Sequence, residues 1–115
     1  MIYELRLPWP PSLNRYYRAV GSRVLISSEG RRYREEVIRI MRMSGVPRHE
    51  MKLRITIHAY PPDRRRRDID NLLKATFDAL QHGGAYSDDS QIVELHAWKH
   101  EPIDESFLIV TIEGV

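Results

Sequence analysis

The stretch from residue 53 to residue 81 most constrains the fold, because it passes from the repeat of a strand to the repeat of a helix across a short charged loop. Apolar and polar residues alternate from Leu53 to Ala59, which predicts a half-buried strand. Pro61 and Pro62 end this strand, since proline cannot donate a ladder hydrogen bond. In α/β architectures, ligands commonly bind where a strand ends and a helix begins.

Residues 71–81 have the composition of a helix, with Asp70 as the predicted N-cap and Gly83-Gly84 as the predicted stop. At about 100° per residue, one face of this helix is apolar and the other is polar. The apolar face carries Leu72, Leu73, Thr76, Phe77 and Leu80. The polar face carries Asp70, Lys74, Asp78 and Gln81.

The same two periodicities predict the other regular elements. Strands are predicted at residues 2–7, 53–59, 91–99 and 107–112. One helix is predicted at residues 71–81, and another, with Ser27 or Ser28 as its N-cap, is predicted to end at about Ser44. The last two strands are predicted to pair as an antiparallel hairpin, and residues 21–26 to form a loop or short hairpin. The order β-α-β-α-β-β predicts an α/β (α+β) fold, in which two helices pack on a small mixed sheet.

Length and composition limit the class of protein. A chain of 115 residues suits a single domain, residues 1–115, and the absence of cysteine excludes a disulfide framework and Cys-ligated zinc. The five histidines lack the spacing of zinc ligands. No apolar run approaches the ~18 residues of a transmembrane span, and the N-terminus lacks the pattern of a signal peptide. We therefore expect a soluble cytoplasmic protein without a membrane partner.

The charges are unevenly distributed along the chain. Residues 1–74 contain 17 of the 18 Lys and Arg but only 8 of the 16 Asp and Glu. This asymmetry predicts a basic surface that binds a polyanion, with nucleic acid as the favoured partner. The alternative is that folding interleaves the two halves and cancels the field.

Four consecutive arginines stand directly before two carboxylates. Guanidinium groups bind phosphate, whereas Asp side chains repel phosphate unless a divalent cation lies between them. The combination favours a metal site at which a nucleic-acid backbone is cut. For the two carboxylates alone, a capped surface helix behind a solvated basic loop is an adequate alternative. The residues concerned are Arg64, Arg65, Arg66, Arg67, Asp68 and Asp70.

Lys74 and a second acidic pair complete the candidate catalytic set. Lys74 follows Asp70 by one helical turn and would position the attacking water, deprotonate it or stabilise the transition-state charge. Asp88 and Asp89 offer a further carboxylate, and spacing does not separate them. Two Mg²⁺ ions about 3.5–4 Å apart, held by Asp side chains, would activate water and stabilise the leaving oxygen.

A polar and aromatic run near the N-terminus is a second candidate for DNA contact. Asn14, Arg15 and Tyr16 begin this run, and Tyr17 and Arg18 end it. Amide, guanidinium and aromatic groups together suit phosphate contacts with bases or sugars against the rings. The alternative is that one or both tyrosines are packing residues.

These motifs resemble the RusA family of Holliday-junction resolvases. The similarity covers DRRRRDIDNLLKATFDAL and SDDSQI, and also LPWPPSLNRYYR and SSEGRRYRE, so it extends over most of the chain. It implies a homodimer that cuts a four-way DNA junction at two symmetry-related positions, in recombination and repair, in a bacterial or phage context. No small-molecule substrate is expected.

The resemblance also implies roles for individual residues. Asp68, Asp70 and Asp89 would be the metal ligands, and Asp89 is preferred to Asp88 because the second acid of the pair is the active-site one in the family. Lys74 would complete the catalytic set, and Asn14 and Arg15 would lie near the DNA. The expected cofactor is Mg²⁺, two ions per site, with Mn²⁺ able to substitute.

Three alternatives remain at this point. A non-catalytic junction or single-strand DNA-binding module would keep the arginines and need no metal. A less specific metal-dependent nuclease would cut linear DNA or RNA as readily as junctions. An arginine patch that docks a partner on an inert fold is disfavoured by its position directly before two carboxylates and a helix start.

Overall fold

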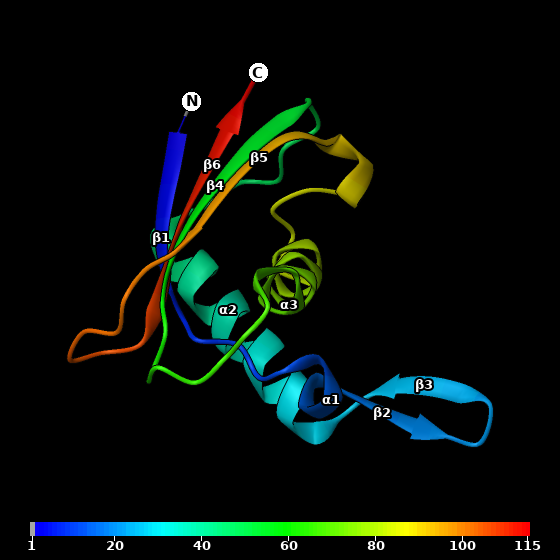
Figure 1. The fold of residues 1–115 in the computed structure, drawn as a ribbon. Helices are drawn as coiled ribbons and strands as arrows, with labels where there is room; N and C mark the ends of the chain where they lie inside the picture. Colours follow the sequence, from blue (N-terminus) through cyan, green and yellow to red (C-terminus); the bar gives the residue numbers. More distant parts are fainter. Residues whose placement is uncertain (1) are drawn as a thin grey trace.

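A four-stranded mixed sheet carries the fold, with its strands in the order β1-β6-β4-β5. The computed structural model describes residues 2–115. Two helices pack on one face of the sheet, and a hairpin extends away from them (Figure 1). The sheet strands are β1 (Ile2–Pro8), β4 (Leu53–Tyr60), β5 (Ile92–Lys99) and β6 (Phe107–Gly114). The other elements are α1 (Leu13–Tyr16), β2 (Tyr17–Val20), β3 (Arg23–Ile26), α2 (Ser28–Ser44), α3 (Ile69–His82) and the 3₁₀ turn η1 (Asp89–Gln91).

The mixed sheet with helices packed on it confirms the predicted fold class, but the predicted hairpin of the last two strands is wrong. β5 pairs in parallel with β4 across the α3 crossover, and β6 lies between β1 and β4, antiparallel to both. β6 takes the centre because Leu108, Val110 and Ile112 are fully buried. β5 takes the edge, where Val93 and Trp98 remain exposed.

One contiguous core joins the sheet to α2 and α3. Alternate residues of β4 are buried from Leu53 to Ala59, as its sequence pattern predicts. On α2, the buried stripe is Gly30, Tyr33, Val37 and Met41. On α3, the buried residues are Leu72, Ala75, Thr76, Ala79 and Leu80. Leu73 and Phe77 are only half-buried, so the apolar face of α3 is rotated from the predicted one.

The two long helices begin with different N-caps. Ser27 caps α2 by accepting a hydrogen bond from the Gly30 N–H, in agreement with the predicted start. The α3 helix starts two residues before the predicted position, since Asp68 has extended backbone angles and is the N-cap. Asp70 therefore lies in the first turn of α3, where its negative charge faces the positive end of the helix dipole.

Folding cancels part of the charge asymmetry of the chain. Arg54 forms ion pairs with Glu94 and Glu113, both from the acidic half. Arg34 likewise pairs with Asp78. The basic surface is thus smaller than the sequence count suggests. Among residues 2–115, none of the helices has the length and apolar character needed to cross a membrane.

Candidate active site

The loop between β4 and α3 spreads its four arginines in different directions. Arg67 forms an ion pair with Asp63 at 2.7 Å and is half-buried, and the Lys99 ammonium donates to its carbonyl oxygen at 2.6 Å. Arg64 turns away to an exposed pair with Glu101. Because Arg67 donates to the Asp63 carboxylate, the pKa of Asp63 is lowered to about 2. We call residues Asp63–Arg67 the arginine loop.

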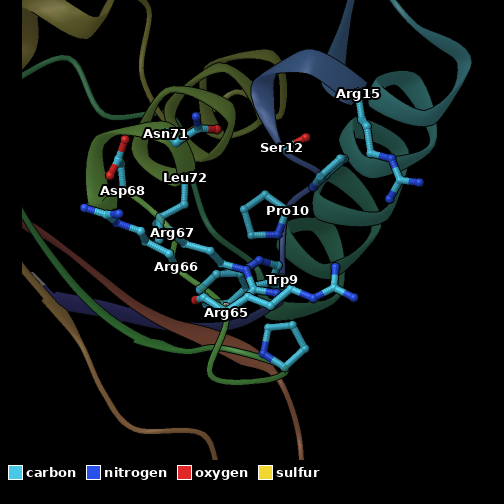
Figure 2. Close-up of a pocket in the computed structure, with 12 residues that line it drawn as sticks. Trp9, Pro10, Ser12, Arg15, Arg65, Arg66, Arg67, Asp68, Asn71 and Leu72 are labelled. Atoms are coloured by element: carbon cyan, nitrogen blue, oxygen red, sulfur yellow. Dashed lines mark hydrogen bonds between the residues drawn. The ribbon is translucent and has the colours of Figure 1, made fainter.

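A cleft of about 820 Å³ lies between the arginine loop and the proline segment Trp9–Ser12 (Figure 2). Arg15 of α1 lines it on the side opposite to Asp68, and Asn71 and Leu72 of α3 line it next to Asp68. Arg65 and Arg66 also line the cleft, whereas Arg64 does not. The arginine run predicted as one DNA-binding group is therefore divided by the fold.

The proline segment is fixed to α3 and to the arginine loop. The Leu13 N–H, at the start of α1, donates to the Asn71 side-chain oxygen at 3.0 Å. The guanidinium carbon of Arg67 lies 5.9 Å from the centroid of the Trp9 ring. Trp9 also packs against the core. Sequence segments 50 residues apart are thereby held as the two walls of one cleft.

Two of the predicted acidic residues lie at the start of α3. Asp68 and Asp70 are both exposed, and neither forms an ion pair within residues 2–115. Asp63 and Asp78, the nearest carboxylates on either side in the sequence, are both paired with arginine. The fold thus leaves Asp68 and Asp70 available to a cation from outside the chain.

Lys74 lies on α3, one turn after Asp70, and Asp89 is the first residue of η1. The Lys74 ammonium is 6.0 Å from the centroid of the Tyr17 ring, and Asp89 is close to Tyr17, Tyr86 and Asp78. Partial burial of its carboxyl group, together with the negative charges of Asp88 and Asp78, raises the pKa of Asp89, although Tyr86 opposes the shift. A cation near Asp89 would stabilise its ionised carboxylate against partial burial and the neighbouring negative charges.

The neighbouring Asp88 has a structural role in this region. Its carboxylate caps η1 by accepting from the backbone N–H and the hydroxyl of Ser90. The Gln91 side chain completes the capping box by accepting from the Asp88 N–H. The hydrogen bonds from the Ser90 hydroxyl and backbone N–H lower the pKa of Asp88. The two adjacent acids therefore differ, since the Asp88 carboxylate accepts two hydrogen bonds from Ser90, whereas the Asp89 carboxylate is partly buried beside Tyr86.

Sequence comparison shows the family of this chain. The sequence profile of the Endodeoxyribonuclease RusA family matches residues 8–113. This chain belongs to the RusA family. It is 49% identical over 98 residues to a crossover junction endodeoxyribonuclease of Enterobacteria phage 82, a match that covers 84% of this chain and 82% of that protein. The proteins of the same name from Shigella sonnei and Escherichia coli K12 are 48% and 47% identical over the same shares.

The RusA-family chain does not gather its three predicted ligands into one cluster. Between residues 2 and 115, no three His, Asp or Glu side chains come close enough together to hold a metal ion. Asp68 lines the cleft, while Asp89 lies beside Tyr86 and the middle of α3. The assignment of Asp68, Asp70 and Asp89 as metal ligands therefore stays a prediction.

The prediction that Tyr16 contacts DNA is wrong for this RusA-family structure, because its side chain is fully buried. Its hydroxyl donates to Asp78, which also accepts from Arg34 at 2.8 and 3.1 Å. Burial and the hydrogen bond to Asp78 raise the pKa of Tyr16. Burial alone would raise the pKa of Asp78, but the hydrogen bonds from Arg34 and Tyr16 outweigh it, and the pKa is lowered.

The sequence pattern does not predict this Tyr16–Arg34–Asp78 triad, which joins α1, α2 and α3. The sequence pattern places Asp78 only on the polar face of its helix and does not indicate a buried partner for it. The available signal was an arginine directly beside Tyr33, which belongs to the buried stripe. Asn14 and Arg15, the other predicted contacts of this segment, are exposed on α1, and Arg15 lines the cleft.

Proposed function

We propose that this protein is a Mg²⁺-dependent, structure-specific endodeoxyribonuclease that resolves four-way (Holliday) DNA junctions in recombination and repair. The observation that carries the proposal is the 47–49% identity, over 84% of the chain, to proteins named crossover junction endodeoxyribonuclease. The site supports it, because Asp68, which forms no ion pair within residues 2–115, lines a cleft that is also lined by arginines. Branched DNA is therefore the proposed substrate.

The donor chemistry of the acidic residues fits Mg²⁺, which prefers hard oxygen ligands. Asp68 and Asp70 are exposed on the first turn of α3 and can change rotamer without disturbing the core. Asp89 is a carboxylate whose raised pKa reflects partial burial near other negative charges. We propose that Asp68, Asp70 and Asp89 hold the metal, with two ions per site and Mn²⁺ as a substitute.

When bound, the metal would supply the Lewis acidity that activates water and neutralises charge on the phosphate. The residues of the chain position the substrate for this step. Arg65, Arg66 and Arg67 bind phosphates beside Asp68, since guanidinium groups form paired hydrogen bonds with phosphate oxygens. Lys74, exposed one turn after Asp70, places a positive charge where negative charge develops on the reacting phosphate.

We also propose that the active form is a homodimer. A four-way junction has approximate twofold symmetry, and proteins normally match such symmetry with their own. Two copies of an active site on a twofold axis would allow paired cuts in symmetry-related strands. A cytoplasmic site of action follows from this proposed substrate, because the relatives come from bacteria and a phage.

The test compares a synthetic four-way junction with a linear duplex of matched sequence. Each is incubated with the protein in Mg²⁺, in Mn²⁺ and in EDTA, and the products are mapped at single-nucleotide resolution. Paired symmetric nicks in the junction alone, dependent on a divalent metal, are expected. Cleavage of both substrates at similar rates would leave a nuclease but remove the structure specificity.

Asp70→Asn tests the metal-ligand role within the same assay. It should abolish cleavage, while junction binding survives or tightens because one carboxylate that repels phosphate is gone. Asp104→Asn, an identical change on an exposed turn before β6, is the matched control and should cleave normally. Loss of binding together with cleavage in Asp70→Asn would count against a metal ligand. Binding without cleavage by the unaltered protein in any divalent metal would instead indicate a binding module.

A further inference from the structure

We propose that the cleft between the proline segment and the arginine loop receives one unpaired nucleotide of the DNA substrate. The base would lie against Trp9 and the adjoining phosphates would contact Arg15, Arg65 and Arg66. This inference rests on the proposed function, since it takes branched DNA as the substrate, and it identifies how the site distinguishes branched DNA from linear DNA.

The lining of the cleft favours a nucleotide over a plain stretch of DNA backbone. A site for phosphates alone needs cations and backbone N–H groups. This cleft also has flat apolar surfaces, supplied by the indole of Trp9, by three prolines and by Leu72. Aromatic rings in a positively charged groove are the usual platform on which unpaired bases stack. The indole belongs to a residue packed against the core, so its ring is held in place before DNA arrives.

The cations of the cleft are available at its rim. Arg66 and Arg15 are exposed and form no ion pair in the described part of the chain, and Arg65 makes only a 3.7 Å contact with Asp63. Arg67, by contrast, is held by Asp63 beside the Trp9 ring. The guanidinium groups at the rim of the cleft are thus free to contact phosphates, while the Arg67 guanidinium is held in place by Asp63.

The inner wall offers polar groups to the edge of a base. The Asn71 side-chain oxygen accepts from the Leu13 N–H, which fixes the orientation of the carboxamide and leaves its NH₂ group to donate. A volume of about 820 Å³ falls within the roughly 300–1,000 Å³ typical of ligand clefts. Because Asp68 lines the same cleft, a nucleotide held there would lie beside the carboxylate proposed for cleavage.

Such a cleft would select for structure rather than only for charge. In a linear duplex each base is stacked and paired, so a base can enter the cleft only after it has been extruded. The cost of extrusion is lowest for a base that is already unpaired or poorly stacked, as at a branch point. Occupation of the cleft would therefore favour a junction over a duplex that presents the same phosphates.

The test is a double-mutant cycle between Trp9 and single bases, measured as binding affinity in EDTA. Junctions with one abasic position, moved stepwise through the branch, are bound by the unaltered protein and by Trp9→Leu. Stacking of one base on an aromatic ring corresponds to roughly 5- to 150-fold in affinity. We expect a loss of about tenfold at one abasic position, a similar loss in Trp9→Leu with the intact junction, and no further loss when the two are combined.

The controls use the second tryptophan and the fourth arginine. Trp98→Leu removes the other indole, which is 48% exposed on β5. Any change that it causes in binding affinity should be the same for the intact junction and for every abasic junction. Arg66→Ala should weaken junction binding more than Arg64→Ala, because Arg64 lies outside the cleft and is paired with Glu101. If Trp9→Leu fails to fold by circular dichroism, Trp9→Phe replaces it and should show weaker coupling at the same position.

The outcomes separate this inference from the proposed function. The unaltered protein is assayed in parallel for cleavage of the intact junction in Mg²⁺. The nucleotide site would be overturned if the protein cleaves the junction but the affinity losses from Trp9→Leu and from an abasic position simply add at every position. The junction nuclease would then remain. Failure to bind or cleave the intact junction would overturn both.

Discussion

Asp78→Asn should destabilise the protein strongly, because it removes the charge at the centre of the Tyr16–Arg34–Asp78 triad. Arg34 donates to both carboxylate oxygens, at 2.8 and 3.1 Å, and Tyr16 donates to one of them. The two charged side chains are only 21% and 20% exposed. The substitution leaves the Arg34 guanidinium partly buried opposite a neutral amide.

The magnitude follows from this geometry. Removing one partner of a fully buried ion pair costs about 3–5 kcal/mol. Because both side chains are about one-fifth exposed, water can still reach Arg34 in the variant. The carboxamide oxygen of the new Asn can still accept one hydrogen bond, so not all of the bonds are lost. We therefore expect a loss of about 2–3 kcal/mol in the free energy of unfolding, close to the value for hydrogen bonds to charged groups. For a chain of 115 residues, 1 kcal/mol corresponds to roughly 4 °C in Tm, so Tm should fall by about 8–12 °C.

The assay is urea and thermal unfolding followed by circular dichroism, at one fixed protein concentration because any dimerisation would shift Tm. Glu36→Gln breaks the exposed Arg39–Glu36 pair and is the matched control, with an expected loss below about 0.5 kcal/mol. A loss in Asp78→Asn as small as that of the control would refute the reasoning.

The pH dependence of this difference provides a second check on the triad. The pKa of Asp78 is lowered in the folded protein, so its contribution is fully present above the ordinary aspartate value near 3.8. It should decline as the pH falls through the lower folded value. The stability of the unaltered protein and of Asp78→Asn should therefore converge in acid. A constant difference down to the acid limit of the folded state would contradict the ionised triad.

Further substitutions should act through contacts in α2 and η1. Gly30→Ala should destabilise by about 1–3 kcal/mol in urea unfolding, because the added Cβ would clash with the backbone carbonyl oxygen of Tyr16; an unchanged midpoint would contradict this contact. Ser27→Ala should cost about 1 kcal/mol in the same assay, since the N-cap bond is lost, and a neutral effect would show that the cap is dispensable. In the junction-cleavage assay, Asp89→Asn should abolish product formation while Asp88→Asn retains it, and equal losses in both would contradict the division of roles.

The periodic parts of the chain were predictable, and the parts decided by tertiary packing were not. The alternation from Leu53 to Ala59 and the Ser27 cap of α2 are local signals, and both are confirmed. The position of β6 depends on competition among strands for the centre of the sheet. Its seven-residue connection from β5 was compatible with a hairpin, and only the stronger burial of β6 excludes that pairing.

The candidate site was predictable in composition but not in arrangement. The arginine run and the acids Asp68 and Asp70 were identified from their unusual juxtaposition. The sequence could not show that Trp9 would stand opposite them, because the cleft is closed by a hydrogen bond between Leu13 and Asn71, which are 58 positions apart. The sequence also predicted that Tyr16 contacts DNA, because a polar run gives no signal that distinguishes a buried tyrosine from an exposed one.

The central position of β6 has a consequence for the way the protein is made. β1 and β4 are translated before the strand that lies between them, and β6 is the only described partner of β1. Until residues 107–114 leave the ribosome, both strands expose unpaired backbone edges, which are templates for pairing with other chains. Closure of the sheet must then wait for a contact between the earliest and latest segments of the fold, a long-range pairing of the kind that slows folding. A nascent chain stalled before residue 107 is therefore the species most exposed to aggregation and to capture by chaperones.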